Sequence, residues 1–186
     1  MAIDAVGGAA ITARMDIRFA QGSDAASLAR LGTDSFVAKF GHLYRPEDLA
    51  NFLGESHSEE KVAKEIADPA LRVVLAEDDG QLLGFCKLVM HCGWPEHARG
   101  AKVIELKQLY TAPEATGQGI GARLMDWALA EAAAFGADEI QLSVYSDNPG
   151  AQKFYARYGF GKVADIHFMV GEKRDEELLF SALLAG

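Results

Sequence analysis

A glycine-rich turn at the start of a predicted helix is the feature that most constrains this chain. Residues 105–122 read ELKQLYTAPEATGQGIGA, a strand-like run that breaks at Pro113 and re-enters as a helix, with Gly117, Gly119 and Gly121 at its start. Glycine has no Cβ, so the backbone can approach a ligand closely. A helix start also presents free N–H groups and the positive end of the helix dipole. We therefore predict that this turn holds a phosphate-bearing cofactor.

A dinucleotide-binding fold is a competing interpretation of the same turn. GQGIGA at 117–122 matches the pattern GxGxxA, and Asp138 and Glu139 follow about 20 residues on, where a ribose-binding acid would lie. In that fold the glycines follow the strand directly, whereas PEAT intervenes here. Too little chain remains after Gly121 for the rest of a doubly wound sheet. A nicotinamide dinucleotide binder is therefore the less favoured alternative.

The run at 148–160, NPGAQKFYARYGF, adds a second pattern. Together the two runs resemble the GCN5-related N-acetyltransferase (GNAT) family. Its cofactor signature is Gln or Arg, two residues, Gly, one residue, then Gly or Ala; here it reads EATGQG at 114–119, departing at Glu114. Its later signature is matched in register by Asn148, Ala151, Tyr155, Gly159 and Phe160. Two signatures in the correct order are more specific than either alone.

The resemblance implies an α/β (α+β) chain with the GNAT fold, whose mixed, mostly antiparallel central sheet has about seven strands flanked by helices. Hydrophobic periodicity and turn residues predict strands and helices compatible with it. The predicted strands are 15–20, 71–77, 81–90, 103–111, 139–145, 160–170 and 177–184. The predicted helices are 24–39, a short one from Pro46, 57–69, 120–135 and 149–158. We expect residues 1–14 to form a flexible extension and 15–186 a single acetyltransferase domain.

Composition excludes several classes of protein. Lys and Arg total 18 against 27 Asp and Glu, a formal net charge of −9 that argues against a nucleic-acid groove. Cys86 and Cys92 form no CxxC motif, and the histidines show no metal-ligating spacing, so we expect no metal and a reducing, cytoplasmic compartment. The chain has no apolar run of the roughly 18 residues that span a membrane, so we expect no membrane partner.

The resemblance implies acetyl transfer from acetyl-CoA to an amine. The residues also suggest which side chain acts as the base that removes a proton from this amine. A lysine-like amine has a pKa near 10.4, so very little is neutral at pH 7. Glu105 is the predicted base: it matches a base glutamate of some family members, and strand alternation puts it on the face of Leu109. The alternative is a solvated glutamate, or one paired with Lys107 or Lys87.

Tyr155 is the predicted acid that protonates the departing sulfur. The assignment rests on the family position, and a phenol with a pKa near 10 is protonated at neutral pH. Tyr158, one helical turn away, is predicted to pack. Asn148 either caps its helix or contacts the cofactor. Neither cysteine lies in a nucleophile motif, which favours direct attack in a ternary complex over a covalent intermediate.

The cofactor site implied by the resemblance combines the strand before the turn, the turn itself and Asn148. In the family the pantetheine arm lies along that strand, and backbone amides of the turn hold the pyrophosphate. The predicted cofactor-binding residues are Leu109, Tyr110, Thr111, Gly117, Gln118, Gly119, Ile120, Gly121, Ala122 and Asn148.

The predicted acceptor is a primary amine of a small molecule or a peptide. The ending HFMVGEKRDEELLF at 167–180 resembles bacterial PaiA-type polyamine acetyltransferases, and with the negative charge it implies a cationic acceptor such as a polyamine. Candidate carboxylates for it are Glu47, Asp48, Glu55, Asp175 and Glu176. Two alternatives remain, a non-catalytic acyl-CoA-binding regulatory module and the dinucleotide binder. A homodimer is an open alternative for assembly.

Overall fold

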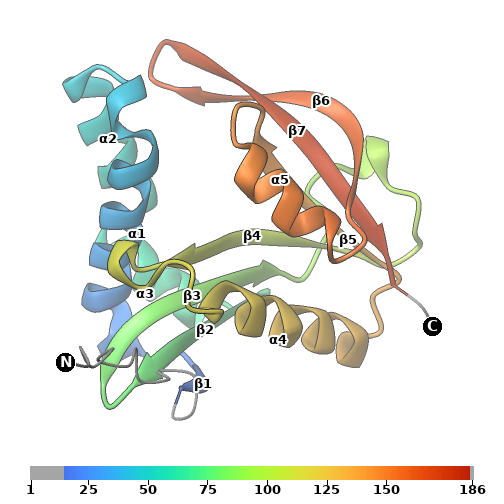
Figure 1. Ribbon diagram of the computed structural model, residues 1–186, viewed down its shortest axis with the longest axis horizontal. Coiled ribbons are helices and arrows are strands. Elements are labelled where there is room, and N and C mark those ends of the chain that lie inside the picture. The colour runs from blue at the N-terminus through green and yellow to red at the C-terminus, as the bar shows by residue number, and fades with distance from the viewer. Residues whose placement is uncertain (1–14, 185–186) are drawn as a thin grey trace, which may run out of the picture.

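The computed structural model describes residues 15–184, so the predicted extension at 1–14 lies outside the described residues. A sheet of seven strands has the order β1-β2-β3-β4-β5-β7-β6 (Figure 1). Its strands are β1 (Asp16–Phe19), β2 (Leu71–Asp78), β3 (Gln81–Val89), β4 (Val103–Thr111), β5 (Glu139–Tyr145), β6 (Gly161–Val170) and β7 (Lys173–Leu183). Its helices are α1 (Ala25–Phe40), α2 (Pro46–Ser56), α3 (Glu59–Ala67), α4 (Ile120–Phe135) and α5 (Pro149–Ala156). The predicted mixed, mostly antiparallel sheet is confirmed, since among these pairs β4 and β5 alone run parallel.

Short-range signals set the ends of several elements. Ser58 caps α3 by accepting a hydrogen bond from the backbone N–H of Lys61. Gly136 ends α4 in the left-handed conformation, with φ of 76°. Asp79 and Gly80 both have positive φ in the tight turn between β2 and β3, as such hairpins require.

The last hairpin is longer than predicted. The sequence predicts the last strand at 177–184. In the structure β7 begins at Lys173, and the turn is closed by Gly171 with φ of 58°. Charged side chains on one face of a hairpin that leaves the core remain solvated, so the charged run KRDEE at 173–177 is compatible with a strand. The extension carries β6 and β7 across to α2 (Figure 1).

The alanine-rich helix α4 packs closely on the centre of the sheet. It contacts β3 and β4, and Ala128 and Ala132 on its inner side are fully buried. Gly84 of β3 allows this approach, because a Cβ there would lie 2.7 Å from the carbonyl oxygen of Tyr110 and 3.2 Å from Leu124. On the other side of the sheet, α1 packs against α3 and β4. The strand that ends in the glycine turn is therefore fixed from both sides.

The parallel pair β4 and β5 separates along its length. In the described chain the two strands pair over Val103–Glu105, while β4 continues to Thr111. β5 continues to Tyr145 beside β7, so it diverges from β4. In Figure 1, α5 lies between β4 and the β6–β7 hairpin. The separation leaves one edge of β4 open to the cleft described next.

Candidate active site

A cleft of about 1130 Å³ follows the separation of β4 and β5. One wall is formed by residues 106–111 of β4 and the glycine turn, and the other by residues 143–145 and α5. Side chains of α1, α2, β6 and β7 line its far end. The volume exceeds that of an ordinary single-ligand pocket, roughly 300–1,000 Å³. The cleft is thus large enough for two ligands side by side.

The glycine turn fits a pyrophosphate. Gly117 and Gly119 have φ of 82° and 81°, a left-handed conformation that glycine adopts without strain. A Cβ built on Gly117 meets no atom within 4 Å, so this side of the turn is open. Gly119 is the N-cap of α4, a helix of 16 residues, and its backbone N–H groups lack intrahelical partners there. The turn therefore offers an open backbone and free N–H groups, and phosphate binding there stays a prediction.

The end of β4 supplies the neighbouring part of the cleft wall. Leu109, Tyr110 and Thr111 all line the cleft. A Cβ on Gly121 would lie 3.6 Å from Leu109 and 3.8 Å from Thr111, so the turn packs directly on the strand. A linear ligand bound at the turn would therefore have the open edge of β4 next to it.

Helix α5 brings Tyr155 to the opposite wall. Asn148 caps the helix by accepting a hydrogen bond from the N–H of Ala151 at 3.3 Å, which confirms the predicted cap. Asn148 also lines the cleft. Tyr155 is half-buried against the rings of Phe154 and Phe160. Burial raises the pKa of the Tyr155 hydroxyl, so it stays protonated at neutral pH. The geometry suits a proton donor.

Glu105 lies apart from the cleft lining. The pairing of β3 with β4 shifts at Lys107, because Lys87 faces Gln108 while Leu88 faces Leu106. The extra residue interrupts the alternation that was expected to place Glu105 beside Leu109. The Glu105 side chain is buried, and its Oε1 lies 3.1 Å from Nζ of Lys107, the predicted alternative pairing. The catalytic role of Glu105 stays a prediction.

The structure brings most of the other predicted site residues together. Gln118 is an exception, since its amide donates to the Glu114 carbonyl at 3.1 Å and its side chain is outside the lining. The predicted residues that line the cleft are Tyr155, Leu109, Tyr110, Thr111, Gly117, Gly119, Ile120, Gly121, Ala122 and Asn148. Ten residues predicted from the runs at 105–122 and 148–160 thus line one cavity.

Comparison with known proteins identifies the family. A family model described as acetyltransferase (GNAT) family matches residues 37–160. The chain belongs to the GNAT family of acetyltransferases. It is 33% identical over 156 residues to an uncharacterized N-acetyltransferase of Mycobacterium tuberculosis, covering 83% of this chain and 94% of that one. The dinucleotide-binding alternative is excluded, both by this membership and by the mostly antiparallel sheet.

Two solved structures show the same fold. The PaiA N-acetyltransferase of Thermoplasma acidophilum, crystallised with coenzyme A, has a TM-score of 0.73 and 24% identity, covering 91% of this chain and 98% of that one. The spermidine/spermine N-acetyltransferase of Vibrio cholerae has a TM-score of 0.65 and 22% identity, covering 94% and 95%. This GNAT protein is an acetyl-CoA-dependent N-acetyltransferase, and acetyl-CoA is its cosubstrate. When bound, acetyl-CoA supplies the acetyl thioester that the turn and β4 would hold.

A histidine that sequence reasoning left unassigned belongs to the cleft of this acetyltransferase. His57 follows α2, is buried, and stacks on Tyr110 with ring centroids 6.2 Å apart. The Ser56 hydroxyl donates to the Phe52 carbonyl at 2.6 Å, so Ser56 Oγ accepts from Nδ1–H of His57 at 2.7 Å. Nε2 of His57 is then an acceptor that faces the Gln108 amide at 3.4 Å. Burial, and next the charge of Lys87, lower the pKa of His57 to about 4.

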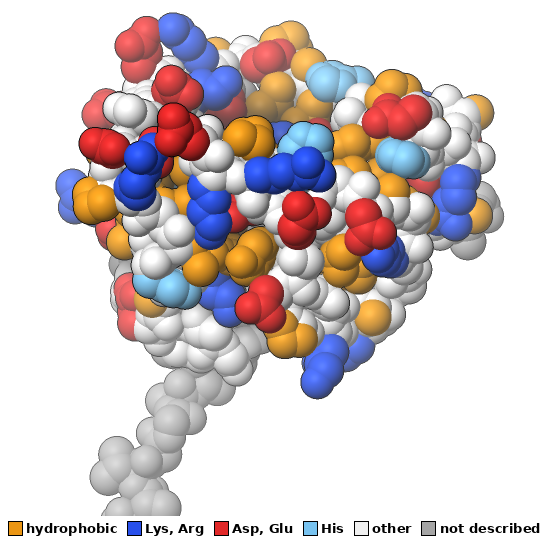
Figure 2. Space-filling view, turned by 90° about the horizontal axis from the view of Figure 1, so that it is seen from above, with side chains coloured by type: hydrophobic (Ala, Val, Ile, Leu, Met, Phe, Trp, Pro, Cys, Tyr) orange, Lys and Arg blue, Asp and Glu red, His pale blue; other side chains and the backbone are white. Residues whose placement is uncertain are grey.

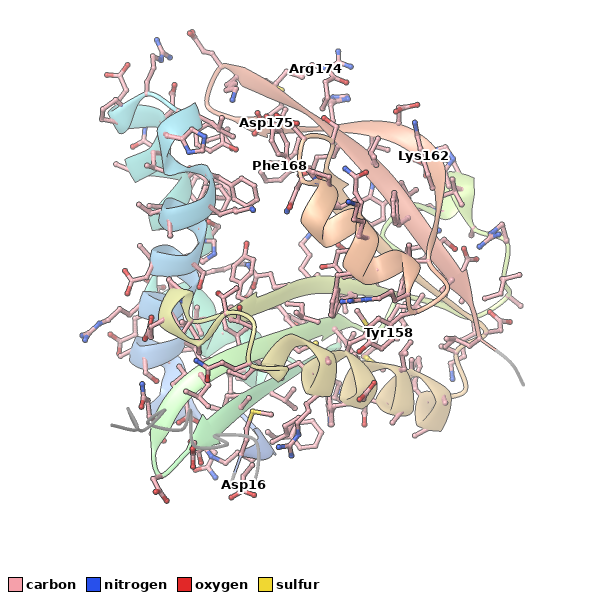
Figure 3. All side chains as sticks on the ribbon, in the orientation of Figure 1. Asp16, Tyr158, Lys162, Phe168, Arg174 and Asp175 are labelled. Carbon is pink, nitrogen blue, oxygen red and sulfur yellow. The ribbon has the colours of Figure 1, made fainter. Side chains whose placement is uncertain are left out.

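At the far end of the acetyltransferase cleft, α2 and the segment before it contact the last hairpin. The Tyr44 hydroxyl donates to Oδ2 of Asp175, and Lys173 Nζ lies 3.1 Å from Oδ1 of the same carboxylate. Phe168 of β6 meets Phe52 of α2 edge to face, with centroids 5.7 Å apart. Figure 3 shows Phe168 and Asp175 on the inner side of the hairpin and Arg174 pointing away. These residues come from distant segments, and no local pattern in the sequence joins them.

The described residues lack the features of a metal site and of a membrane-spanning helix. Residues 15–184 contain no group of three His, Cys, Asp or Glu placed to hold a metal ion. Within the same residues, no helix has the length and apolar character needed to cross a membrane.

Proposed function

We propose that this acetyltransferase moves an acetyl group from acetyl-CoA to a primary amine by direct attack within a ternary complex. The observation that carries the proposal is the continuous cleft: the glycine turn, the open edge of β4, Tyr155 and the side chains of the acceptor end all line it. Holding both reactants in one cavity replaces an encounter in solution by a positioned reaction.

Three groups of the cleft have different roles in the proposed reaction. Backbone N–H groups of the turn around Gly117 and Gly119 bind the phosphates. The open edge of β4 at Leu109 orients the arm and offers N–H groups to the carbonyl oxygen as negative charge develops on it. Tyr155 donates a proton to the sulfur of the bond that breaks.

Direct attack is favoured because the described lining of the cleft contains no cysteine. Cys86 is fully buried in β3, and burial raises the pKa of its thiol, which keeps it protonated and unreactive. Cys92 lies in the loop after β3, and its thiol donates a hydrogen bond to Oε1 of Gln141 at 3.4 Å. A covalent acetyl-enzyme therefore has no nucleophile of this kind at the site.

The acceptor end is open to more than one amine. The net charge of −9 and the fold shared with a spermidine/spermine acetyltransferase support a polyamine. Of the five carboxylates predicted for it, however, Asp175 lines the cleft, whereas Glu47, Asp48, Glu55 and Glu176 are outside the lining. Figure 2 shows acidic and basic side chains interspersed on the face seen from the hairpin end.

A turnover screen tests the proposal. Acetyl-CoA is supplied with polyamines, amino acids, aminoglycosides and peptide N-termini in turn, and free thiol and acetylated product are both quantified. We expect product with at least one primary amine and none when its nitrogen is already acetylated. A protein that binds acetyl-CoA tightly but acetylates no amine would instead be a non-catalytic acyl-CoA-binding module.

A further inference from the structure

The acceptor end of the cleft has an aromatic wall built by side chains of α1, α2, β6 and the segment between the two helices. Phe36 of α1 lies 4.8 Å, centroid to centroid, from Phe52 of α2 and 5.9 Å from the Tyr44 ring. Phe52 in turn meets Phe168 of β6, and Phe168 is 40% exposed although it is a large apolar side chain. All four residues line the cleft. A wall of this kind binds an apolar or aromatic body, and ring faces also attract ammonium groups.

Two carboxylates stand on this wall, and they differ in what already binds them. Asp175 and Glu177 are two residues apart on β7, so they point to the same side of the strand, and both line the cleft. Asp175 is buried: its Oδ2 accepts from the Tyr44 hydroxyl, and its Oδ1, which has no hydrogen-bond partner in the described chain, lies 3.1 Å from the Lys173 ammonium. Glu177 accepts a hydrogen bond from Ser143 and faces the cleft from the strand position opposite Tyr145. The carboxylate left to meet a ligand ammonium is therefore Glu177.

Glu177 lies where the two halves of the cleft meet. Its charge acts on Tyr110 of β4 in the cofactor half and on Tyr44 in the acceptor half. Burial raises the pKa of the Glu177 carboxyl and the neighbouring Asp175 adds to this, while the hydrogen bond from Ser143 and then the charge of Lys107 oppose the shift. His167 of β6 is a further titratable residue in the lining. A carboxylate with a raised pKa accepts a proton more readily than an ordinary surface glutamate.

We propose, building on the acetyltransferase function above, that Glu177 binds the ammonium of the acceptor and takes its proton, while the aromatic wall binds the apolar body of a monoamine. An ammonium loses two protons when it becomes an amide. Glu177 accepts the first before attack and releases it to solvent. As the carbon–nitrogen bond forms and the carbon–sulfur bond breaks, the second leaves the nitrogen for solvent, and solvent restores to Tyr155 the proton it gave to sulfur.

The chemistry of the lining favours a monoamine over a polyamine. A second ammonium needs a second carboxylate, and Asp175 is taken by Lys173. Glu47 and Asp48 are outside the lining and pair with Arg45. The cleft also carries cationic residues, Lys39, Lys107 and Arg157, which repel a long polycation.

The test compares three amines with the full-length protein: 2-phenylethylamine, ethylamine and spermidine. We expect kcat/KM for 2-phenylethylamine to exceed that for each of the other two by about tenfold, the worth of roughly 1.4 kcal/mol of apolar contact. Phe168→Ala should raise KM for 2-phenylethylamine much more than KM for ethylamine. A preference for spermidine would overturn the monoamine assignment.

Glu177→Gln tests the proton acceptor. It keeps the side-chain shape, so kcat/KM should fall on the order of 100-fold for every amine and partly recover at high pH, while the Kd for CoA stays constant. The matched control is Glu176→Gln, an exposed neighbour paired with Arg174 on the other side of β7, for which we expect no change.

The outcomes separate this inference from the proposed function. Normal rates in Glu177→Gln would overturn it, and a loss confined to Glu105→Gln would assign the base to that residue. If no amine is acetylated by the wild-type protein, the proposed function fails, and this inference with it.

Discussion

The two halves of the cleft are built in different ways. The cofactor half consists largely of backbone: a turn held open by Gly117 and Gly119, and the unpaired edge of β4. The acceptor half consists of side chains from α1, α2, β6 and β7, joined by contacts such as Tyr44 with Asp175. A backbone site tolerates many side chains but few changes of conformation, whereas a side-chain site changes its ligand with each substitution. One half can therefore be common to a family while the other selects the acceptor.

The largest effect is expected from a change to the backbone half. Gly119→Asp places a negative charge where phosphate binds, and two charges about 4 Å apart near a surface repel by roughly 4 kcal/mol. Affinity for CoA, measured by calorimetry, should fall on the order of 1,000-fold. Gly119→Asn is the matched control, because Asn tolerates the left-handed conformation similarly and carries no charge. Equal CoA affinities in Gly119→Asp and the wild type would place the phosphates elsewhere.

Tyr155→Phe should have the next largest effect, and on rate rather than on binding. Loss of a general acid typically lowers kcat on the order of 100-fold. The melting temperature and the CoA affinity should change little, since the ring and its contacts with Phe154 and Phe160 remain.

Tyr158→Phe is the control for that experiment. The Tyr158 hydroxyl donates to the Ala122 carbonyl at 3.4 Å, joining the turn after α5 to α4. We expect its kcat to stay close to the wild-type value. A Tyr155→Phe protein that matches Tyr158→Phe in a chemistry-limited assay would show that Tyr155 only packs.

His57, between the two halves, should make stability depend on pH. Its pKa is lowered to about 4 in the folded protein, below the unfolded value near 6.5. The unfolded chain therefore binds the proton first, and stability is lost as pH falls through 6.5 towards 4. Between pH 8 and 5 the loss should be about 2 kcal/mol. Urea unfolding of the wild type and of His57→Gln at both pH values measures it, and an identical pH dependence in the two proteins would contradict it.

The smallest expected effect concerns long-range electrostatics of the acceptor half. Several acidic side chains near it are paired with Arg45, and both signs of charge mix on the visible face (Figure 2). We expect kcat/KM for a cationic amine to fall only about twofold between 20 and 200 mM salt, because the net field is weak and screened. A steep fall, absent with the same salt in CoA binding, would indicate strong steering and favour a polycationic acceptor.

The contrast between the halves also explains which parts of the molecule the sequence predicted. The glycine turn and the Asn148–Phe160 run are local, so residues that act together are also close in sequence. The fold class followed from the resemblance that they carry, and ten of the residues that they predicted for the site line the cleft. Glu177, His57 and Phe168 come together only through the tertiary structure. The bulge at Lys107 was missed as well, because one extra residue in a strand leaves no mark on the alternation of a single chain.

The divergence of β4 from β5 has a consequence for the lifetime of the protein in the cell. An interior strand with a free edge resembles the exposed edge strands through which sheets aggregate. A cosubstrate that lies along this edge covers it, and any ligand that binds the folded state alone stabilises it by mass action. Cellular CoA supply should therefore govern not only how fast this acetyltransferase works but how much of it persists.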